Sequence, residues 1–235
     1  MSTFNKPQLF LTLFIGLLIS LTSFHLTAAD NSITIAKVTK LEGSAYALSQ
    51  DNQKRELKVG SAIYEKDKIF TEDDGLITIL FNDKTRFELG PNANLVASKY
   101  KYKQTEEDSV AINVLKGAFR FVTGLVAKNK PDSMEVGTAV ATIGIRGTHV
   151  IGEADSTSAT IILLAAEDTS RKSKIDVYNE FGSVSIDEAG FGTEIPDEFS
   201  PPSPPRRMAL NTINNLTRSM QQINRVNMPR PRPIR

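Results

Sequence analysis

The sequence predicts one all-β domain of short strands wrapped around a single core, with a different kind of segment at each end. From residue 33 onward, short runs rich in β-branched and aromatic residues alternate with turn residues, and no long helical period interrupts them. An apolar leader precedes this body, and a proline- and arginine-rich segment follows it. We therefore divide the chain into a signal peptide at residues 1–29, a β domain at 30–199 and a tail at 200–235.

The first 29 residues have the layout of a secretory signal peptide. Lys6 is the only charged side chain there, an apolar run extends from Leu9 to Leu21, and small residues follow at Thr27-Ala28-Ala29. A basic start, a short apolar middle and a small-residue exit are typical of exported proteins. We expect cleavage after Ala28 or Ala29, no transmembrane anchor in the mature chain, and a periplasmic or secreted location.

Turn residues and short glycine motifs bound the expected strands. A glycine followed by a small residue opens a strand three times, at Gly43, Gly117 and Gly182. Because glycine tolerates the backbone angles of bulges and corners, we expect these three sites to curl the strands around the core. In the N-terminal half, the expected strands are Ile33–Val38, Ser44–Leu48, Glu56–Val59, Lys68–Phe70, Leu76–Phe81, Thr85–Leu89 and Leu95–Tyr102.

Charge is distributed unevenly along the chain. The net charge of +1 hides a body, residues 30–205, with 20 basic and 27 acidic side chains, and a segment, 206–235, with seven arginines and no acid. This asymmetry predicts that the tail binds an anionic envelope surface or an acidic partner. The seven arginines are Arg206, Arg207, Arg218, Arg225, Arg230, Arg232 and Arg235.

The tail also carries a short amphipathic pattern. A proline-rich spacer at residues 200–205 leads into apolar residues at Ile213, Leu216, Met220 and Ile223, a spacing that places them on one face of a helix. An isolated helix of this length is marginal in water, so we expect it to order only on docking. A membrane, a second copy of the chain and the body of the same chain are the alternatives, and the second of these would give self-association.

Composition excludes several catalytic classes. The chain has no cysteine, and apart from His25 in the leader its only histidine is His149, so thiol catalysis and a histidine triad within one chain are excluded. Acidic clusters at Glu72–Asp74 and Glu106–Asp108 lie in expected turns without apolar walls to raise their pKa. We expect no cofactor and no metal; the alternative function is a hydrolase of envelope polymers that uses an unrecognised carboxylate pair.

The segment Ser98–Lys103 alternates serine or tyrosine with lysine, a pattern compatible with nucleic-acid binding. The acidic body and the predicted export argue against such a partner. We therefore interpret this segment as an edge strand, with the tyrosines packed inward and the lysines guarding the edge.

The segment Thr138–Val150 places two glycines around one arginine within a β-branched run. Its glycine spacing fits neither a dinucleotide-binding loop nor a phosphate-binding loop. We interpret it as a bend in which Gly144 and Gly147 open the backbone, Ile143, Ile145 and Val150 stay in the core, and Arg146 ties down loop carbonyls or a carboxylate. Arg146 and His149 are also candidates for contact with a partner.

At this segment the chain resembles FecR-like domains, named for the ferric citrate uptake regulator. The family motif reads here Ala141-Thr-Ile-Gly-Ile-Arg-Gly-Thr148, with Gly144, Ile145, Arg146, Gly147 and Thr148 as its structural residues. Further family marks are Gly43, Val59-Gly60, Asp67 with Ile69-Phe-Thr71, Asp74-Gly75, Leu115-Lys-Gly117, Gly182 and Ala189-Gly190, so the similarity covers roughly residues 38–195.

The resemblance implies an all-β, non-enzymatic domain on the outer side of the inner membrane. The best-known regulators also carry a cytoplasmic helical segment that holds a sigma factor and a receptor-contacting domain after the β domain, and we expect neither here. We therefore expect an envelope interaction or scaffold module, with signalling as one role and an envelope protein or anionic surface as its partner.

Overall fold

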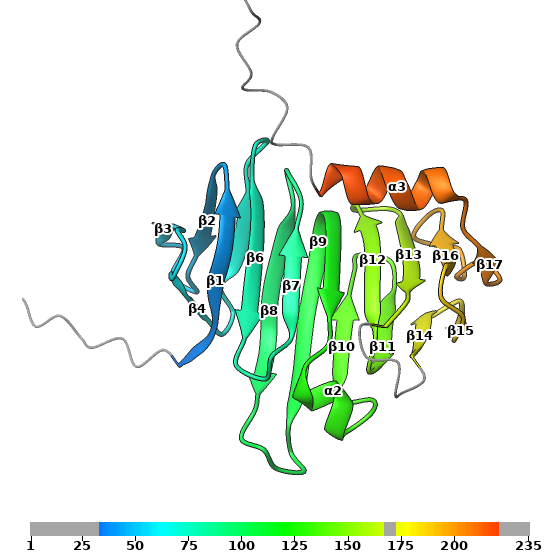
Figure 1. Cartoon of the computed structure of the whole chain (residues 1–235), viewed down its shortest axis with the longest axis horizontal. Helices are drawn as coiled ribbons and strands as arrows, with labels where there is room; N and C mark the ends of the chain where they lie inside the picture. The colour runs from blue at the N-terminus through cyan, green and yellow to red at the C-terminus, as the bar shows by residue number, and fades with distance from the viewer. Residues whose placement is uncertain (1–32, 167–172, 221–235) are drawn as a thin grey trace, which may run out of the picture. The chain divides into compact units, whose positions relative to one another are not determined.

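The computed structural model describes residues 33–166 and 173–220, which form seventeen strands and two short helices (Figure 1). The predicted all-β class is confirmed. Within the described ranges, no helix has the length and apolar character needed to cross a membrane. The helices are α2 (Leu125–Asn129) and α3 (Leu210–Ser219), and the strands are β1 (Thr34–Glu42), β2 (Ala45–Leu48), β3 (Lys54–Glu56), β4 (Ala62–Tyr64), β5 (Lys68–Thr71), β6 (Leu76–Phe81), β7 (Arg86–Leu89), β8 (Asn94–Lys101), β9 (Ser109–Val122), β10 (Met134–Gly137), β11 (Thr142–Arg146), β12 (His149–Ala154), β13 (Ala159–Leu164), β14 (Lys174–Asn179), β15 (Gly182–Ile186), β16 (Phe191–Ile195) and β17 (Arg206–Arg207).

Backbone pairing arranges these strands in two layers. The first layer has the order β4–β1–β6–β7–β9–β12–β13–β16–β17. The second has the order β3–β2–β5–β8–β9–β10–β11–β14–β15. Among the described strands, β9 and β10 pair in parallel and all other neighbours pair antiparallel. The layers are therefore continuous with each other through β9.

Strand β9 passes from one layer to the other at Gly117. Residues 109–116 pair in the second layer and residues 117–122 in the first. Gly117 has a φ of +99°, and a Cβ at this position would lie 2.5 Å from the Cβ of Ala93. Gly43, with a φ of +65°, makes the same crossing between β1 and β2. Two of the three expected corners are thus confirmed, whereas Gly182 starts β15 in a hairpin within the second layer.

The facing sides of the two layers bury one hydrophobic core. Phe87, Phe119 and Phe121 of the first layer stack with ring centroids 5.3–6.3 Å apart. Ile69 and Ile112 of the second layer belong to the same cluster and are buried to within 1%. Burial of aliphatic and aromatic side chains at this density is the main term that stabilises such a fold.

Two local features differ from the sequence prediction. The run expected at Glu56–Val59 is a strand only up to Glu56, because residues 58–61 form a tight turn closed by the hydrogen bond from Ser61 N to Lys58 O at 2.9 Å. Helix α2 was not expected. Its first amide, Leu125 N, donates to Asp83 O at 2.7 Å, and Val126 is buried, so distant contacts fix a helix that has weak local signals.

The segment from Ser98 to Lys103 forms the end of β8 and the turn that follows. Beyond Val96, where its pairing with β5 ends, β8 pairs only with β9 among the described strands. Tyr100 and Tyr102 pack against the core, and Lys99 is exposed. The predicted edge strand with inward tyrosines is confirmed.

Residues 201–220, which we call the C-terminal strap, lie across the first layer (Figure 1). Ser203 N donates to Glu194 O at 3.0 Å, and β17 then pairs with β16. Helix α3 follows and lies beside β12 and β13. The packed structure therefore extends to Met220, beyond the boundary that we expected at residue 199.

The predicted apolar face of the helix packs on the outer side of the first layer. Leu216 and Met208 are buried against Ile151 and Ile162, and Ile213 packs at the edge of this cluster. Met220 is buried in a further small cluster with Leu76 and Ala118. Of the docking surfaces considered from the sequence, the body of the same chain is the one seen here. Ile223 lies outside the described residues.

Candidate functional site

The family motif lies where the chain leaves the second layer. Strand β11 is flanked by β10 and β14, with Ile143 and Ile145 fully buried in the core and Gly144 on the outer face. Gly144 pairs regularly with Glu135 and Asp176, and the nearest atom to a Cβ built there is 3.6 Å away. Gly144 does not open the backbone, which corrects our expectation. An outward-facing position in a regular strand needs no special conformation.

Gly147 makes the bend. Its φ is +63°, and it carries the chain from β11 in the second layer to β12 in the first. Thr148 fixes the corner, because its backbone N–H donates to Thr123 Oγ1 at 2.8 Å and its carbonyl accepts from Thr123 N at 3.1 Å. Val150 is fully buried directly after the bend. The motif thus builds a corner between the layers.

Arg146 extends from the outer face of the second layer and ties two segments together. Its Nε donates to Asp132 Oδ1 at 2.9 Å, in the loop after α2, and its Nη2 lies 3.7 Å from Asp176 Oδ2 on β14. Lys174 Nζ contacts the other oxygen of Asp176 at 3.1 Å. The Arg146 side chain is 44% exposed and that of Asp132 is 63% exposed. Arg146 binds carboxylates as expected, but at the surface, so its loss leaves no deeply buried group unpaired.

The carboxylate of Asp176 is adapted to these neighbours. Partial burial works to raise its pKa, but the hydrogen bond from Ser185 and the positive charges of Lys174 and Arg146 together hold the pKa below its ordinary value. On the same outer face, the Tyr178 hydroxyl donates to Glu135 Oε1 at 3.1 Å. Burial and the neighbouring Glu135 carboxylate raise the pKa of Tyr178. The face is therefore an ion-paired surface at neutral pH.

His149 does not join Arg146 in one patch. It lies on β12 and shares the outer side of the first layer with Ile151, whereas Arg146 lies on the outer side of the second layer. His149 Nδ1 is 3.2 Å from the Ala165 carbonyl oxygen, a contact within its own layer. The two candidate partner contacts therefore lie on the outer sides of different layers.

Two of the tail arginines pair with acids of the β domain. Arg206 Nη2 contacts Glu194 Oε2 at 2.5 Å, and Arg207 Nη2 contacts Glu188 Oε1 at 2.8 Å. The Arg207 guanidinium also lies 5.3 Å from the centre of the Phe191 ring, within cation–π range. Arg218 is exposed on α3. The remaining arginines, at 225, 230, 232 and 235, lie outside the described residues, and their predicted role stays a prediction.

Two acidic residues of the fold, Asp67 and Glu88, pair with arginines. Asp67 accepts from Arg55 Nη2 at 2.6 Å and from Tyr64 N at 3.0 Å, and is buried. Glu88 lies between Arg120, whose Nε donates to it at 3.0 Å, and Arg86. Each of these carboxylates is thus held in an ion pair with an arginine of the fold.

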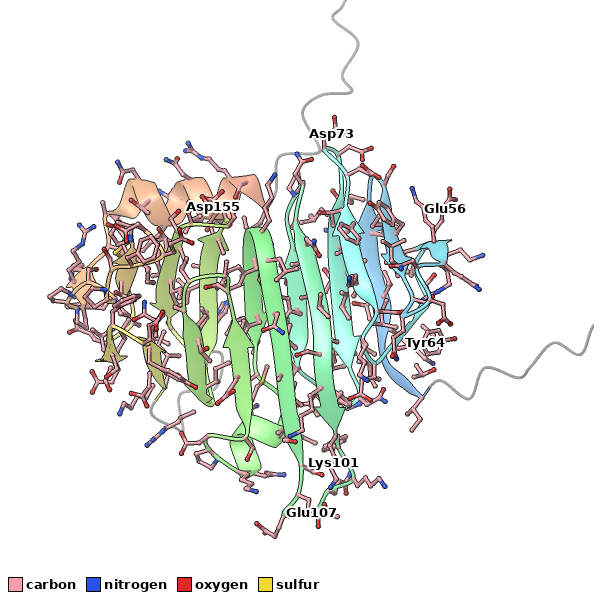
Figure 2. All side chains as sticks on the ribbon, turned by 180° about the vertical axis from the view of Figure 1, so that it is seen from behind. Glu56, Tyr64, Asp73, Lys101, Glu107 and Asp155 are labelled. Carbon is pink, nitrogen blue, oxygen red and sulfur yellow. The ribbon has the colours of Figure 1, made fainter. Side chains whose placement is uncertain are left out.

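The two acidic turn clusters are far from each other. Figure 2 shows Asp73 at one end of the strands and Glu107, beside its partner Lys101, at the opposite end. A carboxylate pair cannot form between them. Across residues 33–166 and 173–220, no three histidine, aspartate or glutamate side chains gather in a way that would hold a metal ion.

Fold and motif define a class of all-β domain in which an arginine-bearing motif builds a corner between two layers. The model of the family described as "FecR protein" matches residues 67–167, from the start of β5 to the end of β13. This match confirms the resemblance to FecR-like domains seen in the sequence. The match includes Gly117 and the whole Gly144–Thr148 motif, and is shorter than the range of roughly 38–195 that we inferred.

Solved structures show more distant likenesses. A "Cell surface anchoring domain" is 34% identical over 26% of this chain and 82% of its own length, with a TM-score of 0.26. Two crystal structures of a "putative anti-sigma factor" from Parabacteroides distasonis are 12% identical, with TM-scores of 0.49 and 0.48. The alignment covers 64% of this chain and 64% of each of those chains. A comparison with curated protein sequences gives no match.

Proposed function

We propose that this chain is an exported, non-enzymatic interaction module of the bacterial cell envelope, acting in signalling or envelope assembly. The observation that carries the proposal is the FecR domain, whose arginine-bearing motif is used here for a corner of the fold and not for a reactive site. The ion pairs of Asp67 and Glu88 with arginines support a structural role for these two carboxylates and not a catalytic one.

Export rests on the leader at residues 1–29. N-terminal sequencing of the protein from a periplasmic or extracellular fraction should give Ala29 or Asp30 as the first residue. Recovery of Met1 on exported protein would contradict cleavage. Affinity capture with the exported form from envelope extract then tests for a protein partner.

The second part of the proposal is that the basic C-terminal segment binds an anionic envelope surface or an acidic partner. Because Arg206 and Arg207 pair with Glu194 and Glu188, the charge available for this contact is that of Arg218 and of the four arginines from residue 225 onward. Each arginine near an anionic membrane contributes on the order of 1 kcal/mol before salt screening. Four or five of them suffice for salt-sensitive surface binding.

Vesicle binding tests this part. Replacing Arg225, Arg230, Arg232 and Arg235 by glutamine should abolish low-salt binding to vesicles that contain phosphatidylglycerol and leave pure phosphatidylcholine unbound. A matched control removes the same amount of charge from the body by replacing the exposed lysines Lys37, Lys58, Lys68 and Lys116 with glutamine. Equal binding by the wild-type protein and the four-arginine variant, or an equal loss in the lysine control, would contradict a role for the segment.

A further inference from the structure

Three loops at one end of the second layer line an open groove. The walls are the β10–β11 turn at residues 138–142, the β14–β15 hairpin at 178–181, and Glu198 in the segment after β16. Its volume is about 520 Å³. The groove is separate from the Arg146 ion pairs, which lie at the other end of β11 and β14. It is large enough to hold several side chains of an extended peptide.

Exposed aromatic side chains surround this groove. Tyr178 and Phe181 line it, with 37% and 43% of their surface exposed, and Phe199 beside them is 72% exposed. The Phe181 and Phe199 rings pack edge to face with centroids 6.5 Å apart. A surface that gathers phenylalanine rings around a hollow is unusual for a folded domain and is typical of a binding site.

The groove is held rigid by hydrogen bonds from one side chain. Asn179 Nδ2 donates to the carbonyl oxygens of Val140 at 3.1 Å and Ser200 at 2.9 Å, which ties all three loops together. Its Oδ1 accepts from the backbone amides of Phe181 at 3.0 Å and Gly182 at 3.2 Å, which sets the direction of the hairpin tip. A preformed groove lowers the ordering cost of binding a ligand.

The groove is acidic as well as aromatic. Glu180 and Glu198 line it, and none of its ten lining residues is basic. Asp197 adjoins it, where its carboxylate accepts from Phe199 N at 2.9 Å and Ser200 Oγ at 2.8 Å and so directs the Phe199 ring outward. Carboxylates next to ring faces attract ammonium and guanidinium groups through both Coulomb and cation–π interactions.

We propose that this groove docks a peptide segment of a partner protein in which lysine or arginine side chains stand next to apolar ones. The inference rests on the proposed interaction function and names the surface and the chemistry of the partner. Charge complementarity favours this occupant, because the apolar side chains would contact the three rings and the cations would meet Glu180 and Glu198. A polysaccharide fits less well, because the Asn179 amide, a hydrogen-bonding group of the wall, is already engaged on both sides.

Peptide binding to the full chain tests the proposal. The probes are fluorescent decapeptides with alternating leucine and lysine, the same peptide with glutamate for lysine, and the same with serine for leucine. The leucine–lysine peptide should bind at least about tenfold more tightly than the other two, because either feature alone satisfies half of the site. Comparable affinities for the three peptides would overturn the proposal.

Variants assign the binding to the groove. Phe181→Ser with Phe199→Ser, Phe199→Ser alone, and Glu180→Lys with Glu198→Lys should each weaken leucine–lysine binding by about tenfold or more. Two controls lie away from the groove. Val59→Ser with Leu210→Ser removes two other exposed apolar side chains, and Asp51→Lys with Glu56→Lys makes the same change in charge as the glutamate variant. Both control variants should bind the peptide as the wild type does. Melting temperatures establish that each variant is folded. We expect Phe199→Ser to keep the fold, because Phe199 is the most exposed of the three rings. Equal effects of folded groove and control variants would overturn the assignment.

Two further probes separate the alternatives. A synthetic peptide of residues 221–235 that bound the groove tenfold more tightly than the leucine–lysine peptide would place the chain's own end there and overturn a partner segment. Soluble envelope polysaccharide that displaced the peptide would do the same. If envelope capture yields one protein equally well with wild type and with the Phe181/Phe199 variant, the groove assignment fails and the proposed interaction function stands.

Discussion

Alanine substitution of three glycines separates backbone strain from steric contact in this fold. Gly144 is regular strand with ordinary space for a Cβ, Gly147 has a φ of +63° with no atom within 4 Å, and Gly117 has a φ of +99° with Ala93 atoms at 2.5 Å. An added methyl group therefore meets no obstacle at Gly144 and only an unfavourable backbone conformation at Gly147. At Gly117 it meets both an unfavourable conformation and a steric clash. The three substitutions are chemically identical, so differences between them report the site.

The expected costs follow from these environments. Gly144→Ala should leave the free energy of unfolding unchanged or raise it by up to about 1 kcal/mol, because alanine loses less entropy on folding. Gly147→Ala should cost about 1–2 kcal/mol, the penalty of a left-handed conformation for an L-residue. Gly117→Ala adds overpacking against Ala93, which is typically about 1–3 kcal/mol, for a total of about 2–5 kcal/mol.

Urea unfolding followed by circular dichroism measures these differences, with the slope of the transition checked for constancy. Gly190→Ala, at a φ of +85° with no atom within 4 Å, is a control for Gly147 outside the family motif. A Gly144→Ala protein as unstable as Gly147→Ala would refute the assignment of the bend to Gly147 alone. Equal costs at Gly117 and Gly147 would refute the close contact with Ala93.

Three further substitutions test other parts of the structure. Arg146→Ala should cost only about 0.5–1 kcal/mol, because its ion pairs are half exposed, and a loss above about 2 kcal/mol in thermal or urea unfolding would show that the site is more buried than described. Leu216→Ala should cost about 2–3 kcal/mol by removing a buried anchor of α3, detected as a lower melting temperature, whereas Asn215→Ala on the exposed side should change little. Hydrogen bonds from Thr157 and Ser158 lower the pKa of Asp155 to about 2, so its contribution to stability is present above about pH 4 and is lost as pH falls towards 2. Asp155→Asn should therefore flatten the acid limb of the stability curve over that range, and an unchanged limb would contradict the loop contacts.

Local pattern was enough to predict much of the fold. The run Leu76–Phe81 is strand β6 residue for residue, and the glycine motifs at Gly43 and Gly117 mark the two crossings between layers. Both rest on short-range chemistry: a β-branched apolar run bounded by turn residues for the strand, and the left-handed backbone for the crossings. Gly144 misled for the same reason, because glycine in a sequence does not reveal whether its conformation is special.

The sequence predicts one part of the C-terminal strap and leaves another part undetermined. The helix face of Ile213, Leu216 and Met220 was recognised, but its docking site was not. The signal lay in Ile161-Ile162-Leu163, an unbroken apolar run that predicts a strand covered on both faces. A strand with one solvent face would alternate there, so this run already required a cover for the outer side of the first layer.

The aromatic groove could not be predicted, because its parts are distant in sequence. Phe181 and Phe199 lie in separate turns, and the turn at residues 138–141 lies well before both of them in the sequence. Only the pairing of β10, β11, β14 and β15 brings these loops to the same end of the second layer. Turn residues carry little periodicity, so the sequence gives no measure of their proximity.

The sharing of β9 has a consequence for how the domain transmits mechanical load. One strand is hydrogen-bonded to β8 and β10 in one layer and to β7 and β12 in the other, so neither layer can slide or peel away without breaking ladders in both. Tension applied to either layer therefore loads hydrogen bonds in both, because the two layers share this strand. A domain built in this way should resist force as a single body.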